Sequence, residues 1–178
     1  ARPHIYIYIC IVYTYIYSTV YSFVICIYVY IYIYSLKKLP CSALLALALA
    51  ASFARLDPVG AQVIKNLQQL LAWRKNWAEW APHAVYLFVA PKFFNENEEL
   101  MAKITALVSG EDRDIVSYDH LATACIEHEA LDLLSDVQSP TLVMGGQYDP
   151  ICSMTAQNWM MDKLPNAELK IFENSSHF

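Results

Sequence analysis

The sequence predicts an α/β fold in which parallel strands alternate with helices, and the carboxyl-terminal segment carries most of this prediction. An apolar strand pattern at 141–144 runs into two glycines, and Asp149 follows them. A helix-length segment comes next, then a second strand pattern at 168–173, and His177 lies just past its end. Parallel neighbouring strands joined by a helix present their carboxyl ends at one edge of the sheet, where open α/β folds build sites. Asp149 and His177 are therefore expected at the same edge.

Residues 1–36 form an apolar, low-complexity tract that precedes this domain. It is dominated by alternating Ile and Tyr, it holds most of the 13 tyrosines, and no charge occurs between Arg2 and Lys37. As a helix, residues 5–34 would be long enough to span a bilayer. The period of two, with β-branched and aromatic residues, is instead typical of a strand.

A third interpretation of the tract is a translated simple repeat. A (TA)n nucleotide repeat encodes alternating Tyr and Ile, and single-base changes give the Val, Cys, Thr and His that interrupt it. We interpret the tract in this way, as read-through from a misassigned start or exon, with a membrane span at 5–34 as the alternative. Localisation is then cytoplasmic if the tract is an artefact and membrane if the span is genuine.

Charge and cysteine usage exclude several function classes. The net charge of −5 gives no electrostatic basis for binding nucleic acid or anionic membranes. The five cysteines include no C-x-x-C pair, so neither a disulfide framework nor a zinc site is indicated. We expect buried free thiols, and no metal or cofactor.

The segment 42–53 is the first candidate strand of the domain. Its alternating Leu and Ala residues have high helix propensity, but strict alternation before the break at Asp57-Pro58 also suits a buried parallel strand. From the residues alone, both readings stay open.

The segment from Val59 to about Asp136 has a helical pattern. Large apolar residues recur at three- and four-residue steps, and Pro82 and Pro91 punctuate the stretch. We expect the first stripe to pack inward; it comprises Ile64, Leu67, Leu71, Trp73, Trp77 and Trp80. After the next strand, 153–163 is expected to be a helix capped by Ser153 and ended at Pro165.

The run from Ser139 through Asp149 and on to His177 resembles the acid- and histidine-bearing end of the α/β-hydrolase family, and the resemblance extends over 42–178. It implies an incomplete α/β-hydrolase fold with parallel strands at about 43–52, 141–145 and 168–173. It also implies a helical cap at about 59–136, and it favours the strand at 42–53.

The resemblance assigns catalytic roles to two residues. In a Ser-His-Asp mechanism, Asp149 would orient the imidazole and His177 would act as general base, on a small ester, lactone or amide substrate. We expect a close but loosely held pair, and a separation beyond about 10 Å, twice the strand spacing, would contradict the assignment. Taken singly, an Asp-Pro turn and a histidine near a chain end are both commonplace on protein surfaces.

The nucleophile of such a site is missing from the sequence. The nucleophile elbow requires G-x-S-x-G, and no two of the four glycines, Gly60, Gly110, Gly145 and Gly146, are spaced for it. We therefore expect an inactive fragment of a serine-type hydrolase. The alternatives are a non-catalytic, hydrolase-like binding module and a membrane-tethered protein with one amino-terminal span.

Overall fold

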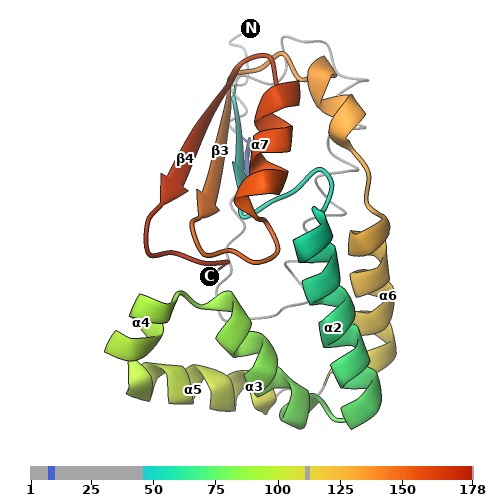
Figure 1. Cartoon of the computed structure of the whole chain (residues 1–178), viewed down its shortest axis with the longest axis vertical. Coiled ribbons are helices and arrows are strands. Elements are labelled where there is room, and N and C mark those ends of the chain that lie inside the picture. Colours follow the sequence, from blue (N-terminus) through green and yellow to red (C-terminus); the bar gives the residue numbers. More distant parts are fainter. Residues whose placement is uncertain (1–7, 11–45, 111–112, 178) are drawn as a thin grey trace, which may run out of the picture.

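The computed structural model describes residues 8–10, 46–110 and 113–177. Its sheet contains four parallel strands in the order β1-β2-β3-β4 (Figure 1). The strands are β1 (Tyr8–Cys10), β2 (Leu47–Ala50), β3 (Thr141–Gly146) and β4 (Ala167–Phe172). The predicted parallel α/β architecture is confirmed, and β1 adds a fourth strand to the three expected, within the tract whose alternating residues are typical of a strand.

Strand β2 settles the ambiguity in favour of a strand for residues 47–50, and residues 42–45 of the segment lie outside the described residues. Leu47 and Leu49 are buried, and the alanines between and after them are half-buried, as alternation in a strand requires. β2 is paired on both sides, with β1 and with β3. Ladder hydrogen bonds on two edges thus override the helix propensity of Leu and Ala.

The amino-terminal tract lies outside the described residues except for Tyr8–Cys10, which form β1. Among the residues that the structure describes, no helix is both long enough and apolar enough to cross a membrane.

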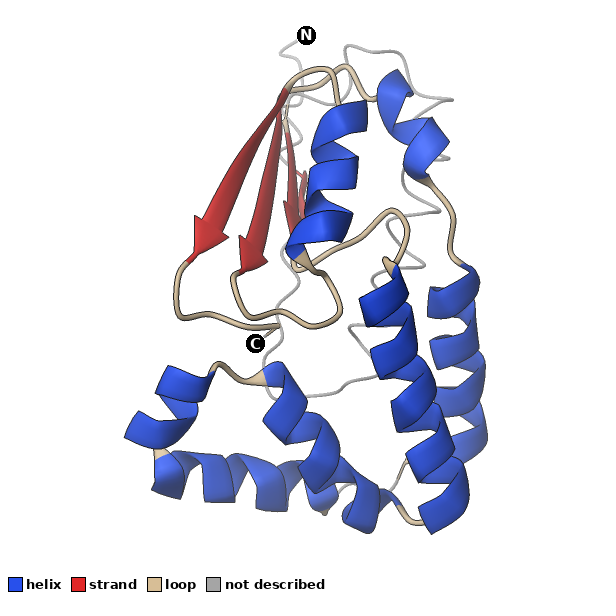
Figure 2. Ribbon diagram, in the orientation of Figure 1, coloured by secondary structure: helices blue, strands red, loops and turns tan. Residues whose placement is uncertain are grey.

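Five α-helices and a short 3-10 helix lie between β2 and β3, where the cap was expected. The α-helices form a lobe beyond the carboxyl ends of the strands, whereas the 3-10 helix packs near α7 and the sheet (Figure 2). The elements are α2 (Pro58–Arg74), α3 (Trp77–Phe88), α4 (Pro91–Glu96), α5 (Glu98–Ser109), α6 (Ile115–Glu127) and η1 (Leu131–Asp136). The carboxyl ends of β3 and β4 point toward the lobe formed by α3, α4 and α5 (Figure 1).

The chain enters and leaves the cap at neighbouring points. Arg55 and Glu129 form an isolated antiparallel bridge, and the amide of Ala130 donates to the carbonyl of Ala54 over 2.8 Å. The two connections between sheet and cap are thereby joined to each other.

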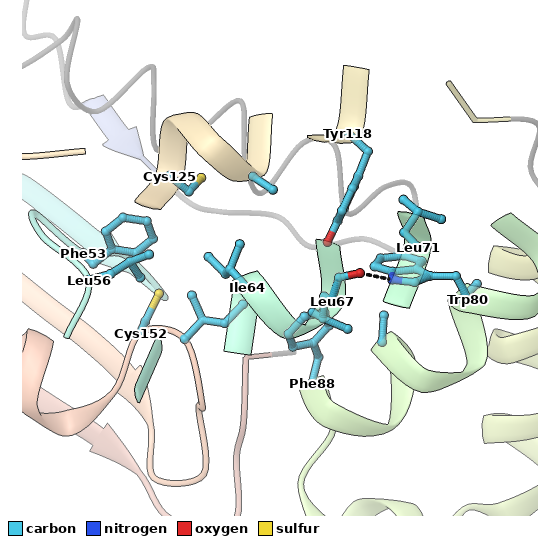
Figure 3. Packing of buried hydrophobic residues seen from close by; sticks show 14 of the residues in the cluster. Phe53, Leu56, Ile64, Leu67, Leu71, Trp80, Phe88, Tyr118, Cys125 and Cys152 are labelled. Carbon is cyan, nitrogen blue, oxygen red and sulfur yellow. Dashed lines mark hydrogen bonds between the residues drawn. The ribbon is translucent and has the colours of Figure 1, made fainter. Parts of the chain in front are cut away.

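The largest apolar cluster ties α2, α3 and α6 together and reaches the loop after β3 (Figure 3). Trp80 is fully buried, and its indole N–H donates to the carbonyl of Leu67 over 2.8 Å. The ring of Trp77 lies tilted against it, and Tyr118 contacts it edge to face. The prediction for Trp73 is wrong: this residue is 77% exposed, because it lies two positions after Leu71 and therefore faces away from the stripe.

Helix α7 (Met154–Lys163) forms where a helix was predicted, and it covers one face of the sheet. Ser153 is its N-cap, and the hydroxyl accepts a hydrogen bond from the amide of Ala156. Met160 packs with Leu49 and Val143 in a second apolar cluster beneath the strands.

Candidate functional site

Asp149 lies in the loop that follows β3, and backbone amides of this loop donate hydrogen bonds to its carboxylate. One oxygen, Oδ1, accepts hydrogen bonds from the amides of Ile151 and Cys152, each at 2.8 Å. The residue is 5% exposed. These bonds hold the carboxylate in one orientation and leave Oδ2 directed to another partner.

His177 lies in the loop that follows β4, and this loop is bound to the first one. The amide of Tyr148 donates to the carbonyl of Ser175 over 2.9 Å, and the Ser176 hydroxyl donates to the carbonyl of Tyr148 over 3.0 Å. Gly146 permits the close approach, because a Cβ there would stand 2.2 Å from the Ser176 carbonyl oxygen. Two loops far apart in the sequence thus form one unit.

The structure brings Asp149 and His177 together. Nδ1 of His177 lies 2.9 Å from Oδ2 of Asp149, and their side chains are only 7% and 0% exposed. Two contacts lie around the pair: the Ser176 hydroxyl donates to the carbonyl of Tyr148, and the imidazole contacts the ring of Phe88 at a centroid distance of 5.5 Å. That the pair is loosely held stays a prediction.

The surroundings of Asp149 favour its ionised form. Burial by itself raises the pKa of this carboxyl group, but the charge on His177 and the hydrogen bonds from His177, Ile151 and Cys152 oppose it. Their combined effect outweighs burial, so the pKa of Asp149 lies below its ordinary value. An anionic carboxylate beside Nδ1 stabilises a positively charged imidazole.

Cys152 stands close enough to this pair to complete a set of metal-type donors. Among the described residues, Asp149, Cys152 and His177 offer ligand atoms that all lie within 4.8 Å of one another. However, Cys152 also packs with Phe53 and Leu56 in the apolar cluster (Figure 3), an environment that favours the neutral thiol over the thiolate that metals bind. We assign no metal to this set.

Sequence reasoning missed three residues that support the site. Asp57 is buried and accepts a hydrogen bond from the hydroxyl of Ser153. Gln157 is fully buried and donates from Nε2 to the carbonyl of Cys152 over 2.7 Å. The Asp57-Pro58 pair is a helix-start signal that could have located the first of these, whereas no local pattern distinguishes Gln157 or the cap residue Phe88.

Comparisons with known proteins agree with this geometry at the level of the fold. No family model and no curated protein matches the sequence. Among solved structures, MGS-M2, an alpha/beta hydrolase enzyme from a Medee basin deep-sea metagenome library, matches with a TM-score of 0.66 and 18% identity. The match covers 76% of this chain and 50% of that one.

Two further solved structures have the same arrangement. An esterase from Exiguobacterium antarcticum matches with a TM-score of 0.61 and 19% identity, over 83% of this chain and 55% of its own. An N-acyl homoserine lactone degrading enzyme matches with a TM-score of 0.57 and 19% identity, over 75% of this chain and 51% of its own. This chain therefore spans about half the length of the structures it matches.

Proposed function

We propose, because this chain has part of an α/β-hydrolase fold, that Asp149 and His177 are the acid and the histidine of a Ser-His-Asp hydrolytic site. The observation that carries the proposal is the buried contact of 2.9 Å between Nδ1 and Oδ2, at the carboxyl edge of a parallel sheet. Buried, oriented and charged groups in such a position are what acyl transfer requires.

The contact between the Asp149 carboxylate and Nδ1 decides which imidazole nitrogen is left to accept a proton. With Nδ1 held by Asp149, proton transfer from a serine hydroxyl would occur at Nε2, the other ring nitrogen. The lowered pKa of Asp149 keeps the carboxylate anionic, so it can stabilise the imidazolium that forms. The solved structures of similar fold include an esterase and a lactone-degrading enzyme, which supports a small ester or lactone as the substrate, whereas an amide rests on the sequence resemblance alone.

The sequence contains no nucleophile elbow for this proposed site. None of the four glycines forms G-x-S-x-G, so we expect the 178-residue chain alone to be inactive. The acid and histidine would act only together with a serine supplied by additional sequence.

The test compares this chain with a longer protein, translated from any transcript that encodes G-x-S-x-G upstream of residue 42. A fluorophosphonate probe and a p-nitrophenyl ester assay should give no reaction with the 178-residue chain. The longer chain should react, and the variants His177→Ala and Asp149→Asn should lower its kcat by on the order of 10⁴-fold. Hydrolysis by the longer chain that survives both substitutions would refute the assignment.

A further inference from the structure

Asp57 is a buried carboxylate outside the Asp149–His177 pair, and its two oxygens bind two different elements. It lies between β2 and α2 and is 3% exposed. Oδ1 accepts the amide N–H of Gly60 over 2.7 Å, which caps the first turn of α2. Oδ2 accepts the hydroxyl of Ser153 over 2.5 Å, across 96 positions of sequence. A buried carboxylate with both oxygens bonded in this way fixes the elements that it joins.

Ser153 links Asp57 to the loop that carries Asp149. Its hydroxyl donates to Asp57 and accepts from the amide of Ala156, so the same oxygen caps α7. Ser153 directly follows Cys152, whose amide donates to Asp149. The position of the acid loop therefore depends on the start of α7, which in turn is bonded to the start of the cap.

Gly60 provides a second contact between the same two elements. A Cβ at this position would stand 2.6 Å from the carbonyl oxygen of Ile151, a backbone atom that has little freedom to move. The amide of the same residue, Ile151, donates to Oδ1 of Asp149. The first turn of α2 thus rests directly on the peptide that orients the acid.

We infer that Asp57 is a positioning residue that couples the first cap helix to the Asp149–His177 pair. It does so through Ser153 on one side of the acid loop and through the Gly60–Ile151 contact on the other. The orientation of the Asp149 carboxylate is set by the location of the cap and not by the sheet alone. The catalytic meaning of this coupling rests on the proposed function, whereas the coupling itself is a property of the fold.

The experiment measures hydrogen exchange at single sites in the whole chain and requires no assay of activity. Ser153→Ala removes the bond to Asp57 but keeps the bond from Asp57 to Gly60. We expect the amides of Ile151 and Cys152 to exchange with solvent faster, on the order of tenfold, because a hydrogen bond to a charged group is lost. The Nδ1–H proton of His177, observed by NMR, should also exchange faster or broaden.

Matched variants separate positioning from general destabilisation. Ser153→Thr keeps the hydroxyl and should restore slow exchange at all three sites. Asp132→Ala removes an exposed carboxylate that pairs with Lys163 in the last turn of α7, and it should change none of them. Asp57→Ala should give a larger effect than Ser153→Ala, since it breaks both bonds.

The outcome that overturns the inference is a folded Ser153→Ala protein in which these three protons exchange as in the unsubstituted chain. Equal acceleration at amides throughout the core, for example in β3, would also overturn it, because the effect would then be global. A failure of the hydrolysis assay leaves these exchange rates unaffected, so the two proposals fail independently.

Discussion

Phe88, the last residue of α3, lies against the imidazole of His177, with the two ring centroids 5.5 Å apart. The residue is buried, and it comes from the cap whereas His177 comes from the sheet edge. A histidine close to the described carboxyl end is therefore braced by an element that lies far from it in sequence.

Replacing Phe88 by Ala should destabilise the protein and loosen this histidine. Loss of a buried phenyl ring removes packing and leaves a cavity, which costs about 3–5 kcal/mol in the free energy of unfolding. Urea denaturation measures the loss. Phe93→Ala is the matched control, because Phe93 is 41% exposed and should change the unfolding free energy far less. Similar losses in both variants would contradict the packing that we describe.

The lowered pKa of Asp149 predicts that stability falls in acid. In the unfolded chain this group titrates at about 3.9, and in the folded protein it titrates lower. The stabilising contribution is thus complete above about pH 5 and is lost as the pH falls through the folded pKa. Unfolding free energies between pH 6 and pH 2.5 should decline less in Asp149→Asn than in the unsubstituted chain. Parallel pH profiles for the two proteins would show that Asp149 does not contribute.

Gly146→Ala should disturb the histidine loop. The new Cβ would stand 2.2 Å from the carbonyl oxygen of Ser176, so the backbone must shift. We expect a loss of about 1–3 kcal/mol in unfolding free energy, typical of overpacking, together with a perturbed His177 resonance in NMR spectra. Gly110→Ala is the control, because a Cβ there would lie 3.3 Å from its nearest neighbour, the carbonyl oxygen of Ala106. This substitution should lower the unfolding free energy much less. The prediction fails if the two alanine variants are equally stable.

Trp80→Phe should destabilise the cap more than Trp73→Phe does. The first substitution leaves the buried carbonyl of Leu67 without its indole donor, at a cost of about 1–3 kcal/mol. The second changes a side chain that is 77% exposed. Urea denaturation followed by circular dichroism avoids the change in tryptophan fluorescence. A smaller loss for Trp80→Phe than for Trp73→Phe would contradict this ranking.

Local patterns in the sequence were enough to predict α7 and the strands on either side of it. Ser153 and Pro165 mark the ends of the helix, and β3 and β4 are bounded by turn residues. Such signals are contained in a few neighbouring residues, and tertiary contacts only reinforce them.

The rest depended on contacts between distant segments. The alternating Leu and Ala of β2 suit a helix or a strand, and the pairing partners on both sides decide between them. The bond between Asp57 and Ser153 and the contact between Phe88 and His177 join residues whose proximity no local spacing encodes. Trp73 lies two positions after Leu71 and so leaves the buried face of α2, and its helical spacing to Trp77 and Trp80 has no structural meaning because α2 ends at Lys75 in a left-handed residue.

The bridge between Arg55 and Glu129 has a consequence for how this architecture can vary. Because the amide of Ala130 is hydrogen-bonded to the carbonyl of Ala54, the segment between these residues begins and ends at neighbouring points outside the sheet. A segment with adjoining ends behaves as an interchangeable module: it can be lengthened, shortened or exchanged while the pairing of β2 with β3 stays in register. The sheet could thus keep its edge geometry through changes elsewhere in the lobe that faces it, provided that equivalents of the Asp57 anchor, the Gly60–Ile151 contact and the Phe88–His177 contact are retained.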